Sequence, residues 1–102
     1  MASGTLGQAS LTAATNTTVY TAAATPTVFS VNIMNTAGTP IAVNLAVAAS
    51  ATPSASEYLE YQTVIPAGGV LERAGIVATS GKRVVAYAPF TGISVNVYGY
   101  EG

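Results

Sequence analysis

The stretch TPIAVNLAVAAS, residues 39–50, places a large aliphatic side chain at every second position from Ile41 to Val47. The positions between them hold alanine and a single amide, Asn44, and the stretch carries no charge. Alternation of this kind is typical of a β-strand with one face in the core. The other face of such a strand is normally polar because it meets water. The stretch therefore predicts a strand, and it raises the question of what covers the alanine face.

The same period-two pattern recurs along the chain, and Gly- and Pro-containing turn signals separate the segments that carry it. No long segment lacks both a helix breaker and a β-branched run, so the pattern does not favour a long helix. We predict an all-β fold, an antiparallel β-sandwich of about seven strands, either immunoglobulin-like or a small jelly roll. Besides 39–50, the segments with strand patterns are 17–21, 27–35, 57–65, 70–77, 82–88 and 92–100.

The first fifteen residues differ in composition from the rest of the chain. They are rich in Ala, Ser, Thr and Gly, and their large apolar anchors are Leu6 and Leu11. We expect an extended N-terminal arm over 1–15, which could pack on its own domain or reach a neighbouring subunit, and a single β-sandwich domain over 16–102. The chain shows no secretory signal pattern and no apolar run of bilayer-spanning length, so we expect synthesis in the cytoplasm without a leader.

Charged residues make up only 7% of the 102 residues, whereas a soluble domain usually carries about 25%. The four acidic and three basic side chains give a net charge of −1. Three cations cannot neutralise the phosphates of a nucleic acid or form a polybasic site for an anionic membrane. We therefore expect neither nucleic acid nor membrane as a partner.

The residue types that usually carry catalysis are missing. The chain has no Cys and no His, which excludes disulfides, thiolate chemistry and imidazole metal sites. Its Ser and Thr hydroxyls lack the usual activating partner. Glu57 and Glu60 are the one close pair of carboxylates, and an offset of three residues places them on opposite faces of a strand. We expect no catalytic residue, no metal site and no cofactor.

Surface tyrosines and the few cations are the best candidates for contacts with other molecules. Tyr58 and Tyr98 are predicted to lie on the outward faces of their strands, where tyrosine combines apolar area with a hydroxyl group; capping the ends of the core is the alternative. Arg73 and Arg83 could pair with glutamates of a neighbouring subunit, or they could be solvated turn residues. The candidate interface residues are Tyr58, Tyr98, Tyr100, Arg73, Arg83 and Asn44.

The small number of charged residues bears on whether the protein assembles with other molecules. A domain of this size leaves roughly a third of its unfolded surface outside the core, and so few ionic groups cannot keep that area hydrated and mutually repulsive. The simplest explanation is that other copies or a larger partner cover part of the outer surface, with small side chains such as those of 42–48 allowing close approach. We expect a homo-oligomer.

Several stretches carry a resemblance to a known group of proteins. They are LGQ at 6–8, TNTTVYTAAATPTVFSVNIMN at 15–35, a Glu- and Tyr-rich middle strand, IPAGGVLERAGI at 65–76 and the terminal VYGYEG. With them the chain resembles the small β-rich virion proteins of tailed bacteriophages. The resemblance implies a sandwich present in many copies on the particle, as a decoration or cement protein on the capsid or as a head-tail or tail component. It carries no active-site residues over to this sequence.

Together these observations predict a non-enzymatic bacteriophage virion structural protein, most simply a capsid decoration or cement protein that stabilises the assembled head through multivalent contacts. Its partners would be the major capsid protein or another virion protein, and its location the virion, assembled in the host cytoplasm. The alternative is a tail, head-tail or fibre component with a carbohydrate- or receptor-binding role, in which tyrosines act as stacking platforms for sugars.

Overall fold

The computed structural model describes residues 3–23 and 26–101. The described chain forms eight β-strands and one short 3-10 turn, η1, with no α-helix. None of its helical residues forms a segment long and apolar enough to cross a membrane. The elements are β1 (Ser3–Ser10), β2 (Thr17–Thr21), β3 (Thr27–Asn35), β4 (Ile41–Ala48), η1 (Ala55–Glu57), β5 (Tyr58–Ile65), β6 (Val70–Ala78), β7 (Arg83–Tyr87) and β8 (Ile93–Glu101).

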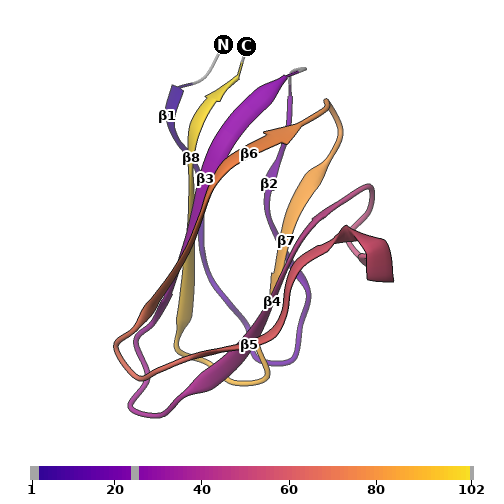
Figure 1. Cartoon of the computed structure of the whole chain (residues 1–102). Helices are drawn as coiled ribbons and strands as arrows, with labels where there is room; N and C mark the ends of the chain where they lie inside the picture. Colours follow the sequence, from indigo (N-terminus) through magenta and orange to yellow (C-terminus); the bar gives the residue numbers. More distant parts are fainter. Residues whose placement is uncertain (1–2, 24–25, 102) are drawn as a thin grey trace.

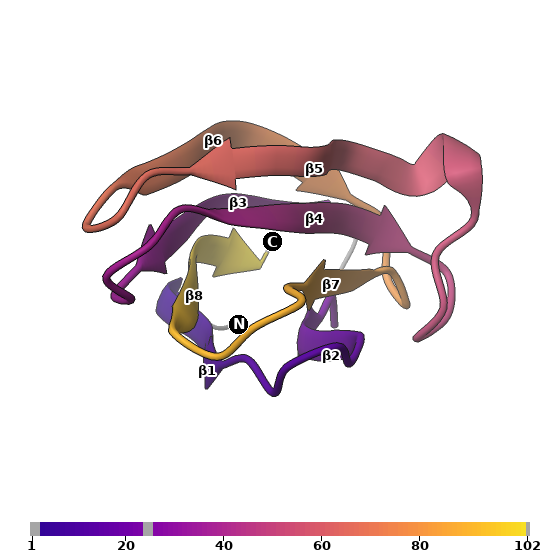
Figure 2. The same cartoon turned by 90° about the horizontal axis from the view of Figure 1, so that it is seen from below.

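The strands form two four-stranded antiparallel sheets packed as a sandwich (Figures 1 and 2). Sheet A has the order β1-β8-β3-β6, and sheet B has the order β2-β7-β4-β5. Strands β1 and β8, β2 and β7, β3 and β6, and β4 and β5 are paired, as in one long hairpin rolled up around its tip. This is the connectivity of a jelly roll. The predicted all-β sandwich is confirmed, with eight strands.

The core lies between the sheets and follows the alternation predicted for β3, β4 and β8. The side chains at every second position of these strands are buried, and the residues between them face outward. Burying branched aliphatic side chains from both sheets supplies the main stabilising free energy of such a sandwich. The branched aliphatic residues that these three strands bury are Val31, Ile33, Ile41, Val43, Leu45, Ile93, Val95 and Val97.

The segment expected to be an arm belongs to the sandwich. Residues Ser3–Ser10 pair with β8 as the edge strand of sheet A. Leu6 and Ala9 pack against the core, and Leu11 is buried in it. The described part of this segment is an extended strand that packs on its own domain. Its sparse apolar residues are enough because a strand at a sheet edge buries only one face.

The β5–β6 edge of the sandwich is bridged by side chains. Arg73 on β6 lies with its Nε 3.0 Å from Glu60 Oε2 on β5, and its guanidinium donates to the Leu59 carbonyl at 2.9 Å. Figure 2 shows these two strands side by side, one from each sheet. Strand β5 departs from the predicted alternation, because Leu45 on β4 is opposite Glu60 whereas Val43 is opposite Thr63. The extra β5 residue is a bulge, which turns Glu60 toward the core side.

The opposite edge is closed by close contact between β1 and β2. A Cβ atom added at Gly7 on β1 would lie 2.4 Å from the Val19 carbonyl oxygen on β2 and 3.2 Å from the Tyr20 Cβ. Only a residue without a side chain therefore fits between the two strands. Gly7 also follows the bulge of β1, where the pairing with β8 shifts after Thr5.

A buried asparagine that the sequence analysis did not single out joins the turns at one end of the sandwich. Asn35 is fully buried, and its Nδ2 donates to the carbonyls of Thr39 and Ile65 at 2.9 and 3.0 Å. Its Oδ1 accepts the N–H of Ala37 at 2.8 Å. The side chain thus holds the β3–β4 turn and the end of β5 in one hydrogen-bonded unit.

Candidate functional site: the two outer sheet faces

The alanine face of β4 is covered partly by the chain itself. Ala46 and Ala48 point away from the core, yet both have 0% exposure. Ala46 is flanked in the sheet by Tyr58 and Val85, and η1 packs against β4. In Figure 1 the η1 turn lies on the side of sheet B that faces away from sheet A. Half of the surface expected to need a neighbouring molecule is therefore buried within one chain.

The carboxylate of Glu57 holds the segment that follows β4. It accepts the backbone N–H of Ala49 at 3.0 Å and that of Ser54 at 2.9 Å, and it lies 3.7 Å from Lys82 Nζ. The Ser54 hydrogen bond, followed by that of Ala49, lowers the pKa of the Glu57 carboxyl, because both donors favour the ionised form. Glu57 and Glu60 thus hold different parts of the chain and do not converge on one cleft.

Asn44 and Tyr58, two predicted interface residues, are engaged within sheet B. Asn44 Oδ1 accepts the N–H of Gln62 at 2.7 Å, at the β5 bulge where Gln62 has a φ of 53°. Tyr58 is half-buried and meets Tyr61 edge-to-face, with ring centroids 5.0 Å apart. Arg83 is half-buried on β7, opposite Thr21 and Ala48.

Beside Asn44, the outer face of sheet B is hollowed. The hollow has a volume of about 460 Å³ and is lined across three neighbouring strands by Ala42, Asn44, Gln62, Val64, Tyr87 and Pro89. Its β4 residues are small, whereas Val64 protrudes at 61% exposure. Phe90, which follows Pro89 in the turn after β7, is 64% exposed. None of the lining side chains is charged.

The outer face of sheet A is rich in exposed apolar side chains. Register places Val28, Tyr100 and Val77 in one row across β3, β8 and β6. The described chain has eight exposed large hydrophobic residues, and five of them lie on this face: Met34, Val70, Val77, Tyr98 and Tyr100. Exposed apolar side chains that share one face, rather than being scattered over the surface, are typical of interaction surfaces.

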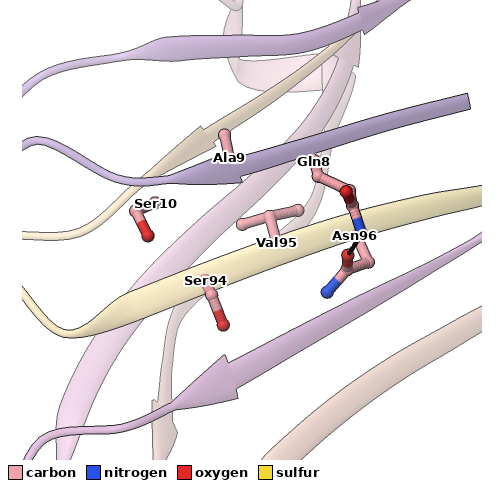
Figure 3. A pocket seen from close by; sticks show the side chains of 6 residues that line it. All are labelled: Gln8, Ala9, Ser10, Ser94, Val95 and Asn96. Atoms are coloured by element: carbon pink, nitrogen blue, oxygen red, sulfur yellow. Dashed lines mark hydrogen bonds between the residues drawn. The ribbon is translucent and has the colours of Figure 1, made fainter.

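A row of amides crosses the middle of the same face. Gln8 on β1, Asn96 on β8, Asn32 on β3 and Glu72 on β6 are successive register partners. Gln8 Nε2 donates to Asn96 Oδ1 at 2.7 Å (Figure 3). The shallow depression in Figure 3 is lined by this pair, by Ser10 and Ser94, and by Ala9 and Val95. The face is thus polar without being ionic along this row, except at its Glu72 end.

Tyr98 is held in place by the Glu72 carboxylate. Its hydroxyl donates to Glu72 Oε2 at 2.8 Å, and this hydrogen bond to an acceptor anion raises the pKa of the Tyr98 phenol. The ring is nevertheless 39% exposed. Among the side chains described on the outer face of sheet A, Glu72 is the one with a charge.

The predicted interface residues therefore fall in three places. Tyr98 and Tyr100 lie together on the outer face of sheet A, Asn44, Tyr58 and Arg83 lie on the outer face of sheet B, and Arg73 bridges the β5–β6 edge. Sequence reasoning missed Val70 and Val77, which share the face of Tyr98. In the described part of the chain, no group of three or more His, Cys, Asp or Glu residues is arranged to hold a metal ion.

Comparisons with known proteins add little to this geometry. No protein-family model matches the chain, and no curated protein matches it. Among solved structures, a chain described as "Cyanophage Pam1 capsid asymmetric unit" aligns with 95% of this chain and 84% of its own length, at 21% identity and a TM-score of 0.30. The chain is thus distantly similar in structure to a phage capsid component, and a score of this size carries no argument about function.

Proposed function

We propose that this protein is a non-enzymatic structural component of a bacteriophage particle, a capsid decoration or cement protein that binds major capsid or other virion proteins through the outer face of sheet A. One observation carries the proposal: five of the eight exposed large hydrophobic residues of the described chain gather on that face, beside one charged side chain. An exposed apolar area of this kind favours a protein surface as its partner. The sequence resemblance to small virion proteins points to the same class.

The physical mechanism is mass action. A protein that binds only the assembled lattice stabilises it in proportion to RT ln(1 + [L]/Kd). Copies held at symmetry-related positions add the effect of high effective concentration, so that weak single contacts give firm attachment. Such contacts need a surface with few charges to desolvate, which the sheet A face provides.

A second candidate is a tail or fibre component that binds carbohydrate. It is favoured by the placement of the exposed Tyr98 ring two residues along β8 from the Gln8–Asn96 amide pair, since amides can bond sugar hydroxyls while a ring stacks on the sugar. The jelly-roll fold does not decide between these candidates, because it occurs in both capsid and lectin domains.

A matched pair of valines tests the proposal. Val77 on sheet A and Val64 on sheet B are 64% and 61% exposed, so a charge at either position leaves the core intact. Val77→Glu should weaken attachment to phage particles that lack the protein by about tenfold or more, whereas Val64→Glu should still attach at saturating concentration. Particles with the wild-type protein bound should release DNA at a higher temperature than bare particles.

Two results would count against the cement role: equal attachment of both variants, or unchanged thermal release of DNA with the wild-type protein bound. Binding to a glycan array that disappears in Tyr98→Ala would favour the carbohydrate-binding candidate instead.

A further inference from the structure

We propose that the surface of the virion protein that binds sheet A carries a positively charged side chain, which on binding lies against the carboxylate of Glu72. Glu72 thereby fixes the position of the two proteins relative to each other, while the apolar residues around it supply the contact area. The inference rests on the proposed function and deepens it, because it gives the chemistry of the partner at one defined point of the sheet A face.

The first observation is where the Glu72 carboxylate lies. Glu72 is on β6, the edge strand of sheet A, and Tyr98 is on β8, with β3 between the two strands. The Tyr98 hydroxyl nevertheless donates to Glu72 Oε2 at 2.8 Å, so the two side chains meet over β3. The carboxylate is therefore drawn over the outer face of the sheet. A protein that covers this face also covers the carboxylate.

The second observation is that the described part of the chain offers this carboxylate no cation. Two of the three glutamates whose side chains the structure describes are ion-paired within the chain: Glu60 with Arg73 at 3.0 Å and Glu57 with Lys82 at 3.7 Å. The third, Glu72, forms no ion pair with a described residue, and the remaining cation, Arg83, lies on the other sheet. The described chain thus leaves the charge of Glu72 for another molecule to pair.

The charge of Glu72 decides which partner surface fits. An ionised carboxylate taken out of water needs an ion-pair partner and further hydrogen bonds to offset its lost hydration. The hydrogen bond from the neutral Tyr98 hydroxyl does not replace the water around both oxygens. Against a purely apolar partner Glu72 would weaken binding. Against a positively charged side chain it strengthens binding and disfavours other orientations of the partner.

The neighbours of the carboxylate suit a cationic side chain. Asn32 is the register partner of Glu72 on the adjacent strand, which places their Cβ atoms about 5 Å apart on one face. The side-chain oxygen of Asn32 can accept a second hydrogen bond from the same cationic group. The Tyr98 ring is 39% exposed and adds an aromatic face, which attracts cations. No described side chain on this face is cationic, so none repels the incoming group.

Attachment of the full chain to phage particles that lack it, measured as a dissociation constant, tests the inference. Glu72→Gln keeps the shape and an acceptor for the Tyr98 hydroxyl but removes the charge, and it should weaken attachment by about tenfold. Glu72→Lys should weaken it further, because two cations then meet. Glu57→Gln makes the same change in net charge on the other sheet and should attach like the wild type. Circular dichroism should show the same β spectrum for all four proteins.

Added salt gives a second measurement. Raising the salt concentration should weaken attachment of the wild type more than attachment of Glu72→Gln, because salt screens the pair that the variant lacks.

Equal or tighter attachment of Glu72→Gln would overturn the inference, because that is the result expected for an apolar partner. Equal weakening in Glu57→Gln would also overturn it, by assigning the effect to net charge. The cement role would survive either result as long as Val77→Glu attaches more weakly than the wild type. Particles that bind no wild-type protein would instead overturn the cement role, and this inference with it.

Discussion

Asn44 Oδ1 accepts the backbone N–H of Gln62 at 2.7 Å, and this bond joins the one amide on the outer face of β4 to the bulge of β5. A bulge leaves a backbone group without its partner in the strand ladder, and here a side chain of the neighbouring strand supplies the acceptor. The single polar residue in an otherwise aliphatic and alanine strand therefore has a role within the fold.

Replacing Asn44 by Ala should lower the free energy of unfolding by about 1 kcal/mol, the typical net contribution of one hydrogen bond. Urea denaturation measures this change, and Asn32→Ala is the matched control, since Asn32 is also a half-buried outward asparagine on a central strand. An equal effect of the two substitutions would show that the Asn44–Gln62 bond contributes nothing specific.

Gly7→Ala should destabilise the protein by about 1–3 kcal/mol, the range for forcing an extra methyl group into packed structure. The added Cβ would meet the Val19 carbonyl oxygen at 2.4 Å, so β1 and β2 would have to separate. Gly38→Ala is the control, because a Cβ there meets nothing within 4 Å. Thermal unfolding of the two variants should give a clearly lower midpoint for Gly7→Ala, and equal midpoints would contradict the close contact.

Acidification should release the segment between β4 and β5. The pKa of Glu57 is lowered from its ordinary value of 4.5 in the folded chain, so the stabilisation is present above that value and is lost as the pH falls through the lowered pKa. The amide resonances of Ala49 and Ser54, which donate to this carboxylate, should shift together over that interval in NMR spectra.

Glu57→Gln should abolish this joint pH response, whereas Glu72→Gln, on the other sheet, should retain it. A response of the Ala49 and Ser54 amides that persists in Glu57→Gln would assign it to another group.

How much of the structure the sequence predicts depends on whether alternation is interrupted. Strands such as 27–35 and 41–48 keep a strict period of two, and their core faces are predicted correctly. Strand β5 contains a bulge at Gln62, with φ 53°, so Glu60, which alternation assigns to the solvent side, is turned toward the core side. A positive φ at a glutamine is a tertiary effect that no local propensity signals.

The same reason limits prediction of the candidate site. The outward position of Tyr98 follows from alternation in β8, but Val77 does not stand out because β6 is bulged near Gly75, where φ is 69°. Whether Arg73 pairs within the chain depends on which strands of the two sheets meet at an edge. That is a property of topology, and a period in the sequence does not encode it.

The β5–β6 and β1–β2 edges of the sandwich bear on whether free copies of such a charge-poor chain aggregate. Open strand margins template the addition of further strands and lead to fibres. Here the guanidinium of Arg73 donates a hydrogen bond to the Leu59 carbonyl at the β5–β6 edge. At the opposite edge, Gly7 has no side chain, so β1 and β2 lie in close contact. Free copies of the chain should accordingly resist the addition of further strands at these two edges.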